Sequence, residues 1–151
     1  MTIPASSIMG TNLRKFNHTY KEFNDIYHDL CRRLDLSDSA FDILYSLYEM
    51  GDGCLQRDIC QTSCLPKQTV HSSIRKLEQQ GYLTLTPGKG RSMHIFLTPA
   101  GHTLIEEKIL PVVTMENQAF SCMTPEEIQT MLRLHERYCA ALRQTFETYK
   151  S

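Results

Sequence analysis

The sequence predicts a mostly α-helical fold that contains one small β-hairpin. Along most of the 151 residues, apolar side chains recur at intervals of three and four, the pattern of helices with one buried face. Two short runs, 82–86 and 93–97, instead alternate with a period of two, which is typical of half-buried strands. A hydrophobic content of 41% with 22% charged residues argues against disorder, so we expect one folded domain over residues 1–151.

The first half of the chain predicts a long helix followed by three shorter ones. A single apolar stripe runs along residues 12–34. Ser37 or Asp38 is placed to cap the next helix, and the glycines of the 51–53 segment end it. A short helix fits residues 55–61. Another helix then begins with Pro66 in its first turn and ends at Gly81.

The helix over residues 66–81 has two contrasting faces. Val70, Ile74 and Leu77 follow the i, i+4, i+7 spacing of a core-facing stripe. Short or flexible hydrogen-bonding side chains fill the opposite face, and no acidic residue occurs there before Glu78. These side chains are Lys67, Gln68, Thr69, His71, Ser72 and Arg75. Such a face suits contacts with base edges and phosphates, although a polar helix face is most often only solvated.

The hairpin favours the nucleic-acid interpretation. Its connector, Pro-Gly-Lys-Gly-Arg, places Lys89 and Arg91 at a flexible tip, and the two strands must pack on the preceding helices to be stable. The segment 55–98 holds six basic and two acidic residues, a net charge of +4, while the rest of the chain carries −5. The order helix, turn, helix, basic hairpin predicts a winged helix-turn-helix core over residues 37–98, with one helix in a major groove and the wing beside it.

The second half predicts further helices over residues 99–149. Thr98 is placed to cap the first of them, and Pro111 should kink or interrupt it. Thr124 and Glu127 have capping-box spacing at the start of the last one. Long apolar stripes on this helix and on residues 12–34 exceed what one small core can cover. We therefore expect a symmetric dimer with two recognition helices about 34–36 Å apart, bound to pseudo-palindromic DNA. A C-terminal helix packed back on its own domain is the alternative.

Two stretches, CLQRDICQTSCLPKQTVHSSIRKLEQQGYLTL and GKGRSMHIFLTPAGHTLI, resemble the core of the MarR family of transcriptional regulators. The resemblance spans residues 41–105. It implies a winged-helix core flanked by N- and C-terminal dimerisation helices, at residues 12–34 and 99–149, and a repressor that acts as a homodimer on double-stranded DNA. The chain departs from the family at Lys89, where an Asp is common, and at Ser72, where a basic residue is common.

The resemblance also implies a crevice between the dimerisation helices and the core, which in many members receives a small aromatic or phenolic effector. Candidate lining residues are Tyr20, Phe23, Tyr27, His28, Tyr45 and Tyr48. For each aromatic residue taken singly, a plain core role is the stronger interpretation.

The six cysteines contain no CxxC pair, which favours reduced thiols in a cytoplasmic protein. Among them, Cys64 lies next to the basic helix and is the candidate redox-sensitive thiol, whereas Cys60 is expected to pack inward. His28, Cys31 and His102 have no recognisable metal-ligand spacing. We therefore predict no metal and no cofactor.

No catalytic motif is present, because the chain has neither a phosphate-binding glycine loop nor HExxH or GxSxG. The sequence also has no long apolar run, so we expect no membrane partner. The competing hypothesis is a winged-helix module that binds proteins and not DNA. Such a module would be expected to expose apolar anchors on the helix face that here is polar and basic.

Overall fold

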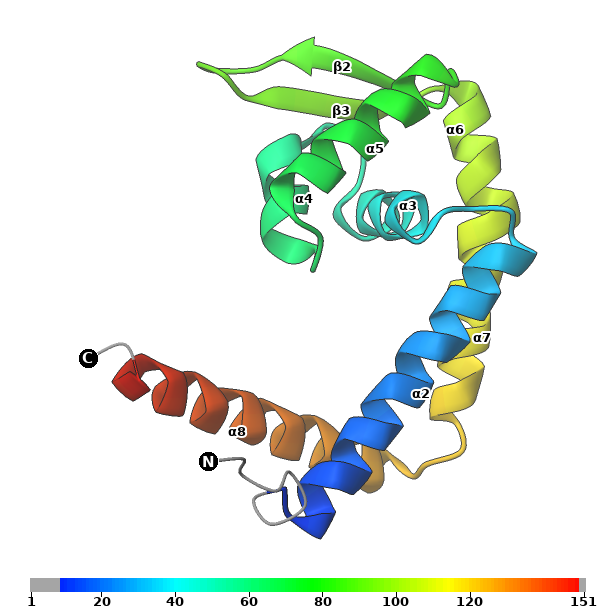
Figure 1. The fold of residues 1–151 in the computed structure, drawn as a ribbon. Coiled ribbons are helices and arrows are strands. Elements are labelled where there is room, and N and C mark those ends of the chain that lie inside the picture. The colour runs from blue at the N-terminus through cyan, green and yellow to red at the C-terminus, as the bar shows by residue number, and fades with distance from the viewer. Residues whose placement is uncertain (1–8, 150–151) are drawn as a thin grey trace. The chain divides into compact units, whose positions relative to one another are not determined.

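The computed structural model describes residues 9–149 and confirms the predicted fold class, mostly helical with a small antiparallel sheet (Figure 1). The chain divides after Ile109 into two compact units. The first unit contains α2 (Thr11–Arg33), α3 (Asp38–Met50), β1 (Cys54–Leu55), α4 (Gln56–Thr62), α5 (Lys67–Gln79), β2 (Leu83–Pro87), β3 (Met93–Leu97), α6 (Pro99–Leu104) and the π-helical turn η1 (Ile105–Ile109). The second contains α7 (Leu110–Phe120) and α8 (Pro125–Tyr149).

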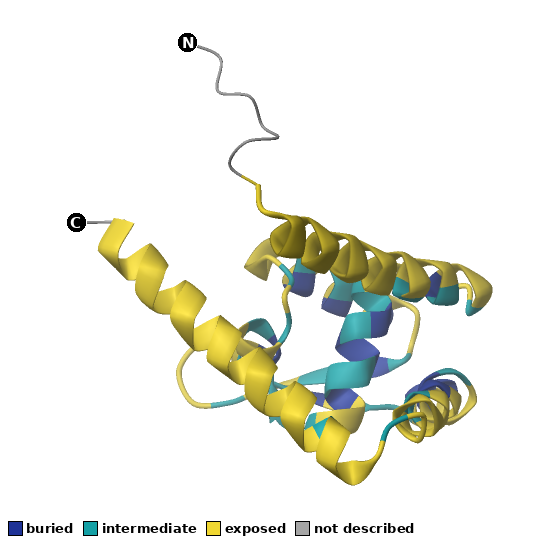
Figure 2. Ribbon diagram, turned by 90° about the horizontal axis from the view of Figure 1, so that it is seen from below, coloured by how far each residue is buried: buried dark blue, intermediate teal, exposed yellow. Residues whose placement is uncertain are grey.

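The core of the first unit is built around α3, four residues of which are buried; Figure 2 colours the ribbon of buried residues dark blue. Ser37 caps this helix by accepting a hydrogen bond from the Ala40 N–H at 3.2 Å, as its sequence predicts. Fully buried partners come from α4, α5, both hairpin strands and η1. The side chains that form this core include Leu44, Leu47, Ile59, Val70, Ile74, Leu83, Ile95 and Ile109. Burying each of them contributes about 1.5–3 kcal/mol to folding.

The sheet has three strands in the order β1-β3-β2, all antiparallel. The predicted hairpin is present, with Leu83 opposite Leu97 and Leu85 opposite Ile95. The third strand, Cys54–Leu55, was not predicted from the sequence, because two residues cannot display a period of two. It pairs Cys54 with Ile95 and so covers the second edge of β3.

Pro111 has the predicted effect on its helix. The helical run from Pro99 changes to a π turn at Ile105–Ile109, just before the proline. A proline ring clashes with the carbonyl four residues earlier, here that of Glu107, and the wider π turn accommodates it. Upstream, Thr98 caps α6 by accepting from the Gly101 N–H at 3.1 Å, with Pro99 in the first turn.

In the second unit, α8 begins with the predicted capping box. The Thr124 N–H donates to Glu127 Oε2 at 2.8 Å, and the Glu127 N–H donates to Thr124 Oγ1 at 3.2 Å. Along α8 every side chain except the half-buried Ile128 is exposed, which Figure 2 shows as a continuous yellow helix. The exposed side chains include Leu132, at 44% exposure, and Phe146, at 62%.

Candidate nucleic-acid interface

The two faces of α5 differ in burial as the sequence predicts. Val70 and Ile74 are 0% exposed and Leu77 is 2% exposed, so this stripe lies wholly in the core. Pro66 stands one residue earlier than expected. It is the residue that precedes the helix, with φ −58° and ψ 143°, and its carbonyl accepts from the Val70 N–H at 3.1 Å. The first turn of α5 is thereby held at a fixed angle to the preceding loop.

The outer face of α5 forms a shallow hollow. Five of the residues selected from the sequence line it: Gln68, Thr69, His71, Ser72 and Arg75. All except the half-buried Thr69 are exposed, and Lys67 stands exposed at the start of the same helix. Since positions 68, 71, 72 and 75 are spaced i, i+3, i+4 and i+7, their side chains form one stripe opposite the core.

Two internal hydrogen bonds determine what this stripe can offer a ligand. The Ser72 hydroxyl donates to the Thr69 carbonyl at 3.1 Å, so its oxygen lone pairs remain available as acceptors. The Gln56 side-chain amide donates to Nδ1 of His71. Gln56 is the first residue of α4 and is only 8% exposed. Sequence analysis missed this pair, which no local spacing reveals.

The end of α5 fixes the direction in which the hairpin leaves the helix. Gly81 adopts a φ of +82°, its N–H donates to the Glu78 carbonyl at 2.9 Å, and the Tyr82 N–H donates to the Leu77 carbonyl at 3.0 Å. These two bonds form a Schellman motif, which needs a residue with positive φ at this position. The chain therefore passes from α5 into β2 without a flexible linker.

The tip of the wing is a tight, basic turn. The Gly88 N–H donates to the Ser92 carbonyl at 2.7 Å, and the Ser92 hydroxyl donates to the Lys89 carbonyl. Gly90, with a φ of +66°, lies between the exposed side chains of Lys89 and Arg91. In Figure 1 the loop joining β2 and β3 projects away from the helices.

The cations of α5 and of the wing have no acidic partner in the part of the chain that the structure describes. Within residues 9–149, no carboxylate lies within ion-pair distance of four of them: Lys67, Arg75, Lys89 and Arg91. Three cations outside this set do have a carboxylate partner in the described chain: Lys21 with Asp25, Arg32 with Asp29 at 3.7 Å and Arg57 with Asp58 at 3.6 Å. Uncompensated positive charge beside a hydrogen-bonding helix face suits an anionic partner such as DNA.

The match to a family model agrees with this geometry. Residues 29–92, which run from the end of α2 to the tip of the wing, match the MarR family model. The helix-turn-helix core and the wing of this chain are therefore similar to the MarR family. Residues 9–149 contain no helix long and apolar enough to cross a membrane.

Solved MarR structures share the fold over almost the whole chain. NMB1585, a MarR family regulator from Neisseria meningitidis, is 18% identical and has a TM-score of 0.81, with 91% of this chain and 98% of that one covered. MepR from S. aureus, solved as a DNA complex, is 23% identical with a TM-score of 0.70, and the coverage is 89% and 99%. BpsR from Bordetella bronchiseptica, whose DNA binding is regulated by 6-hydroxynicotinic acid, is 19% identical with a TM-score of 0.65, and the coverage is 83% and 98%. No curated protein matches the chain.

The residues predicted to line a MarR effector crevice fall into two groups. Tyr27 and Tyr45 lie on either side of the buried Phe41, with ring centroids 6.1 and 5.7 Å from it. Tyr20 and Tyr48 are exposed, at 57% and 42%. Phe23 contacts Tyr27 with ring centroids 5.0 Å apart. Phe41 was not among the crevice residues predicted from the sequence, although its i, i+4 spacing to Tyr45 places both on one face of α3.

His28, the remaining crevice candidate, is exposed, and its Nδ1 lies 2.9 Å from Asp38 Oδ2. This contact joins α2 to the first turn of α3. The imidazole therefore already has a carboxylate partner, at the surface between α2 and α3.

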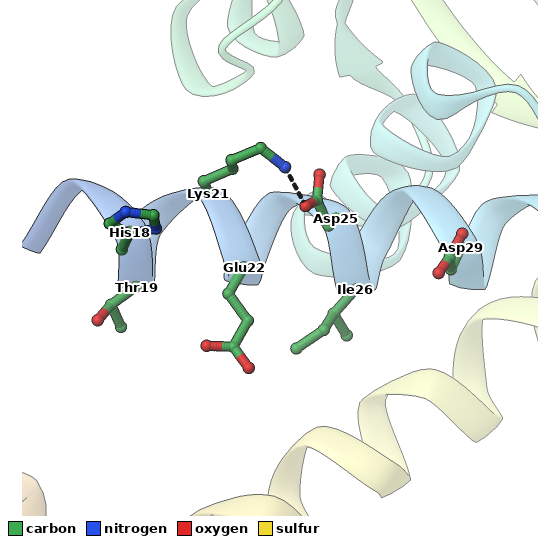
Figure 3. A pocket seen from close by; sticks show the side chains of 7 residues that line it. All are labelled: His18, Thr19, Lys21, Glu22, Asp25, Ile26 and Asp29. Carbon is green, nitrogen blue, oxygen red and sulfur yellow. Dashed lines mark hydrogen bonds and ion pairs between the residues drawn. The ribbon is translucent and has the colours of Figure 1, made fainter. Parts of the chain in front are cut away.

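Two other hollows occur on the described surface. One, of about 370 Å³, lies where the α2–α3 turn, α5 and η1 meet and is lined by Ser37, Ser73, Lys76 and Lys108 among others. Lys108 there donates to the Leu34 carbonyl. The second is formed by α2 alone, as Figure 3 shows, and contains the ion pair of Lys21 with Asp25. In the described residues, no group of three or more His, Cys, Asp or Glu side chains is arranged to hold a metal ion.

The cysteines differ in accessibility. Cys64 is exposed and Cys60 is half-buried. Cys31 is 2% exposed, and burial together with the charges of Asp38 and Asp42 raises the pKa of its thiol to about 11. Burial, with Asp58 and Asp52 nearby, also raises the pKa of Cys54. The thiol that precedes α5 is therefore accessible, as are those of Cys122 and Cys139.

Proposed function

We propose that this chain is a MarR-type sequence-specific DNA-binding repressor that acts as a homodimer on a pseudo-palindromic operator. The observation that supports it best is the surface formed by α5 and the wing. It combines a stripe of exposed hydrogen-bonding side chains with four cations that no carboxylate of residues 9–149 neutralises. The solved complex of MepR with DNA, which has the same fold, agrees with this function.

Within this surface we assign two roles. Gln68, Thr69, His71 and Ser72 contact base edges in the major groove, because they lie on the outward stripe of α5. The phosphates or the minor groove are contacted by cations that have no carboxylate partner among the described residues, two of them at the wing tip: Lys67, Arg75, Lys89 and Arg91.

Homodimer formation follows from the exposed apolar faces of α2 and α8. Phe23 and Ile26 on α2 are 57% and 59% exposed, and α8 exposes Leu132, Leu134 and Phe146. Apolar stripes of this length are uncommon on the free surface of a monomer. A symmetric partner would bury them and place two copies of α5 one DNA turn apart.

We also propose that a small aromatic effector releases the operator. The aromatic residues between α2 and α3 form the candidate site, with Tyr27 and Tyr45 closest to its centre. BpsR, a structural neighbour whose DNA binding is regulated by 6-hydroxynicotinic acid, supports an effector of this chemical class.

The decisive experiment is a binding titration with labelled DNA from upstream of the chain's own gene, repeated between 50 and 200 mM salt. Four cations per subunit give about eight phosphate contacts per dimer, so log K should fall with log salt at a slope of about −7. Random DNA of equal length serves as competitor and should bind at least about a thousandfold more weakly. A folded dimer that binds neither DNA at low salt would refute the proposal and favour a protein-interaction module.

A further inference from the structure

Gln56 is the one buried polar side chain among the residues that the structure describes. It begins α4, and its Nε2 group donates a hydrogen bond to Nδ1 of His71, fifteen residues away on α5. A buried amide that loses its partner destabilises the folded state, so this contact is favoured there. The pair therefore links the interior of the helix-turn-helix to the face of α5 proposed to contact DNA.

The direction of this hydrogen bond determines the chemistry of His71. A neutral imidazole carries one proton, and the nitrogen without it is the acceptor. Because Nδ1 accepts from Gln56, the proton resides on Nε2. His71 is itself exposed and lines the hollow on α5, so Nε2–H is the ring group left for a ligand.

We infer that Gln56 is a positioning residue that sets the base preference of His71, an inference that rests on the proposed DNA-binding function. Held as an Nε2–H donor, His71 selects base edges that present an acceptor in the major groove. These are O6 or N7 of guanine, N7 of adenine and O4 of thymine. It disfavours the cytosine edge, which presents the N4 amino donor.

The tautomer can be measured without DNA. The ¹⁵N chemical shifts of the His71 ring in the free protein distinguish protonated from unprotonated nitrogen. We expect Nε2 protonated and Nδ1 unprotonated in the parent. In Gln56→Glu the carboxylate can only accept, so the proton should move to Nδ1. A parent that carries its proton on Nδ1 would overturn the inference, whatever its affinity for DNA.

The consequence for DNA is tested with the tightest site in the upstream region and variants of it at each base pair. In Gln56→Met, which keeps the side-chain length but cannot donate, preference at one base pair of each half-site should fall on the order of tenfold. Affinity for random DNA should change less than about twofold, because phosphate contacts are unaffected. Gln61→Met is the matched control, since Gln61 is exposed on the same short helix and should change neither quantity.

Because Gln56 is buried, Gln56→Met could lose preference through misfolding, and a replacement of the exposed His71 provides a second test. His71→Gln should lose preference at the same base pair as Gln56→Met. Loss at a different base pair, or full preference retained in Gln56→Met with the expected tautomer in the parent, would overturn the positioning role and leave DNA binding intact. A parent that binds no DNA would refute the proposed function, and the base preference with it, even where the ring shifts show the expected tautomer.

Discussion

Asp52 contacts His102 on α6 and thereby joins this helix to the base of the wing, which precedes it. Its Oδ1 accepts from the Leu97 N–H at 2.7 Å, and its Oδ2 lies 3.0 Å from Nε2 of His102 on α6. Asp52 stands in the loop between α3 and β1, so one carboxylate connects three segments that are distant in sequence. The last residue of β3 and the first turns of α6 are held to the core at this point.

We expect Asp52→Ala to lower the free energy of unfolding by about 1–2 kcal/mol, because it removes a charge-assisted hydrogen bond to the backbone. His102→Ala removes only the ion pair, whose two side chains are 54% and 37% exposed, and should cost less than about 1 kcal/mol. Urea unfolding of both variants will show whether Asp52→Ala lowers the free energy of unfolding more than His102→Ala does. Equal losses would show that the Leu97 bond contributes nothing beyond the ion pair.

Gly101 lies where no side chain can be accommodated. A Cβ at this position of α6 would overlap the carbonyl oxygen of Tyr82 and lie 3.1 Å from Leu97 Cδ2. That carbonyl cannot simply turn away, because it accepts from the Thr98 N–H at 3.1 Å.

Gly101→Ala should therefore destabilise the fold by about 1–3 kcal/mol, more than the roughly 1 kcal/mol by which alanine favours a helix. Ala100→Ser, at the exposed neighbouring position, should stay within about 0.5 kcal/mol of the parent. Thermal and urea unfolding measure both. A more stable Gly101→Ala would mean that the wing and α6 are not in contact here.

How much of the fold is predictable depends on the length of each element. The long helices were found because ten or more residues display a period clearly, and the caps at Ser37, Thr98 and Thr124 lie where side-chain chemistry requires. Strand β1 was missed because its two residues become a strand only through pairing with Ile95 and His94 of β3. No local pattern contains that information.

The candidate site shows the same limit. The outer face of α5 follows directly from the positions of Val70, Ile74 and Leu77, so its polar residues could be named from the sequence. The pairing of Gln56 with His71 could not, because it depends on the angle between α4 and α5. For the same reason, which aromatic residues gather around Phe41 required the packing of α2 on α3.

The buried thiol of Cys31 should resist alkylation in the native protein. With a pKa of about 11, it is about 0.1% thiolate at pH 8, whereas an ordinary thiol of pKa near 9 is about 10% thiolate. We expect iodoacetamide to modify the exposed Cys64, Cys122 and Cys139 first and Cys31 last, as peptide mass spectrometry will show.

The raised pKa of Cys31 also makes the free energy of unfolding depend on pH. The folded state holds the Cys31 proton more tightly than the unfolded state does, so this thiol lowers the free energy of unfolding as the pH rises from about 9 to 11. In Cys31→Ala that contribution should be absent, and the loss of stability over this interval should be smaller. An unchanged pH dependence would contradict the raised pKa.

The proposed dimer predicts a sharp difference between two faces of α8. Leu132→Glu places a charge on the apolar stripe and should shift the protein to monomer at concentrations where the parent is dimeric, because an unpaired charge is costly to bury. Thr130→Glu, at an exposed position about 200° away around the helix, should leave the mass unchanged. Sedimentation equilibrium distinguishes the two, and a monomeric parent would refute the dimer itself.

The division of roles on the DNA-binding surface can be tested with one cation and one amide. Arg91→Ala removes a charge at the wing tip that no carboxylate of the described chain pairs with, so it should weaken binding to all DNA and reduce the salt slope by about 1 per subunit. Gln68→Ala removes a base-edge group from α5, so it should relax preference at one or two base pairs, each by about 1–3 kcal/mol, and leave the slope unchanged. Titrations of both variants against operator and random DNA at several salt concentrations separate these effects. Equal losses on every DNA for both variants would mean that α5 and the wing do not differ in role, because a base-edge contact must depend on sequence and a phosphate contact must not.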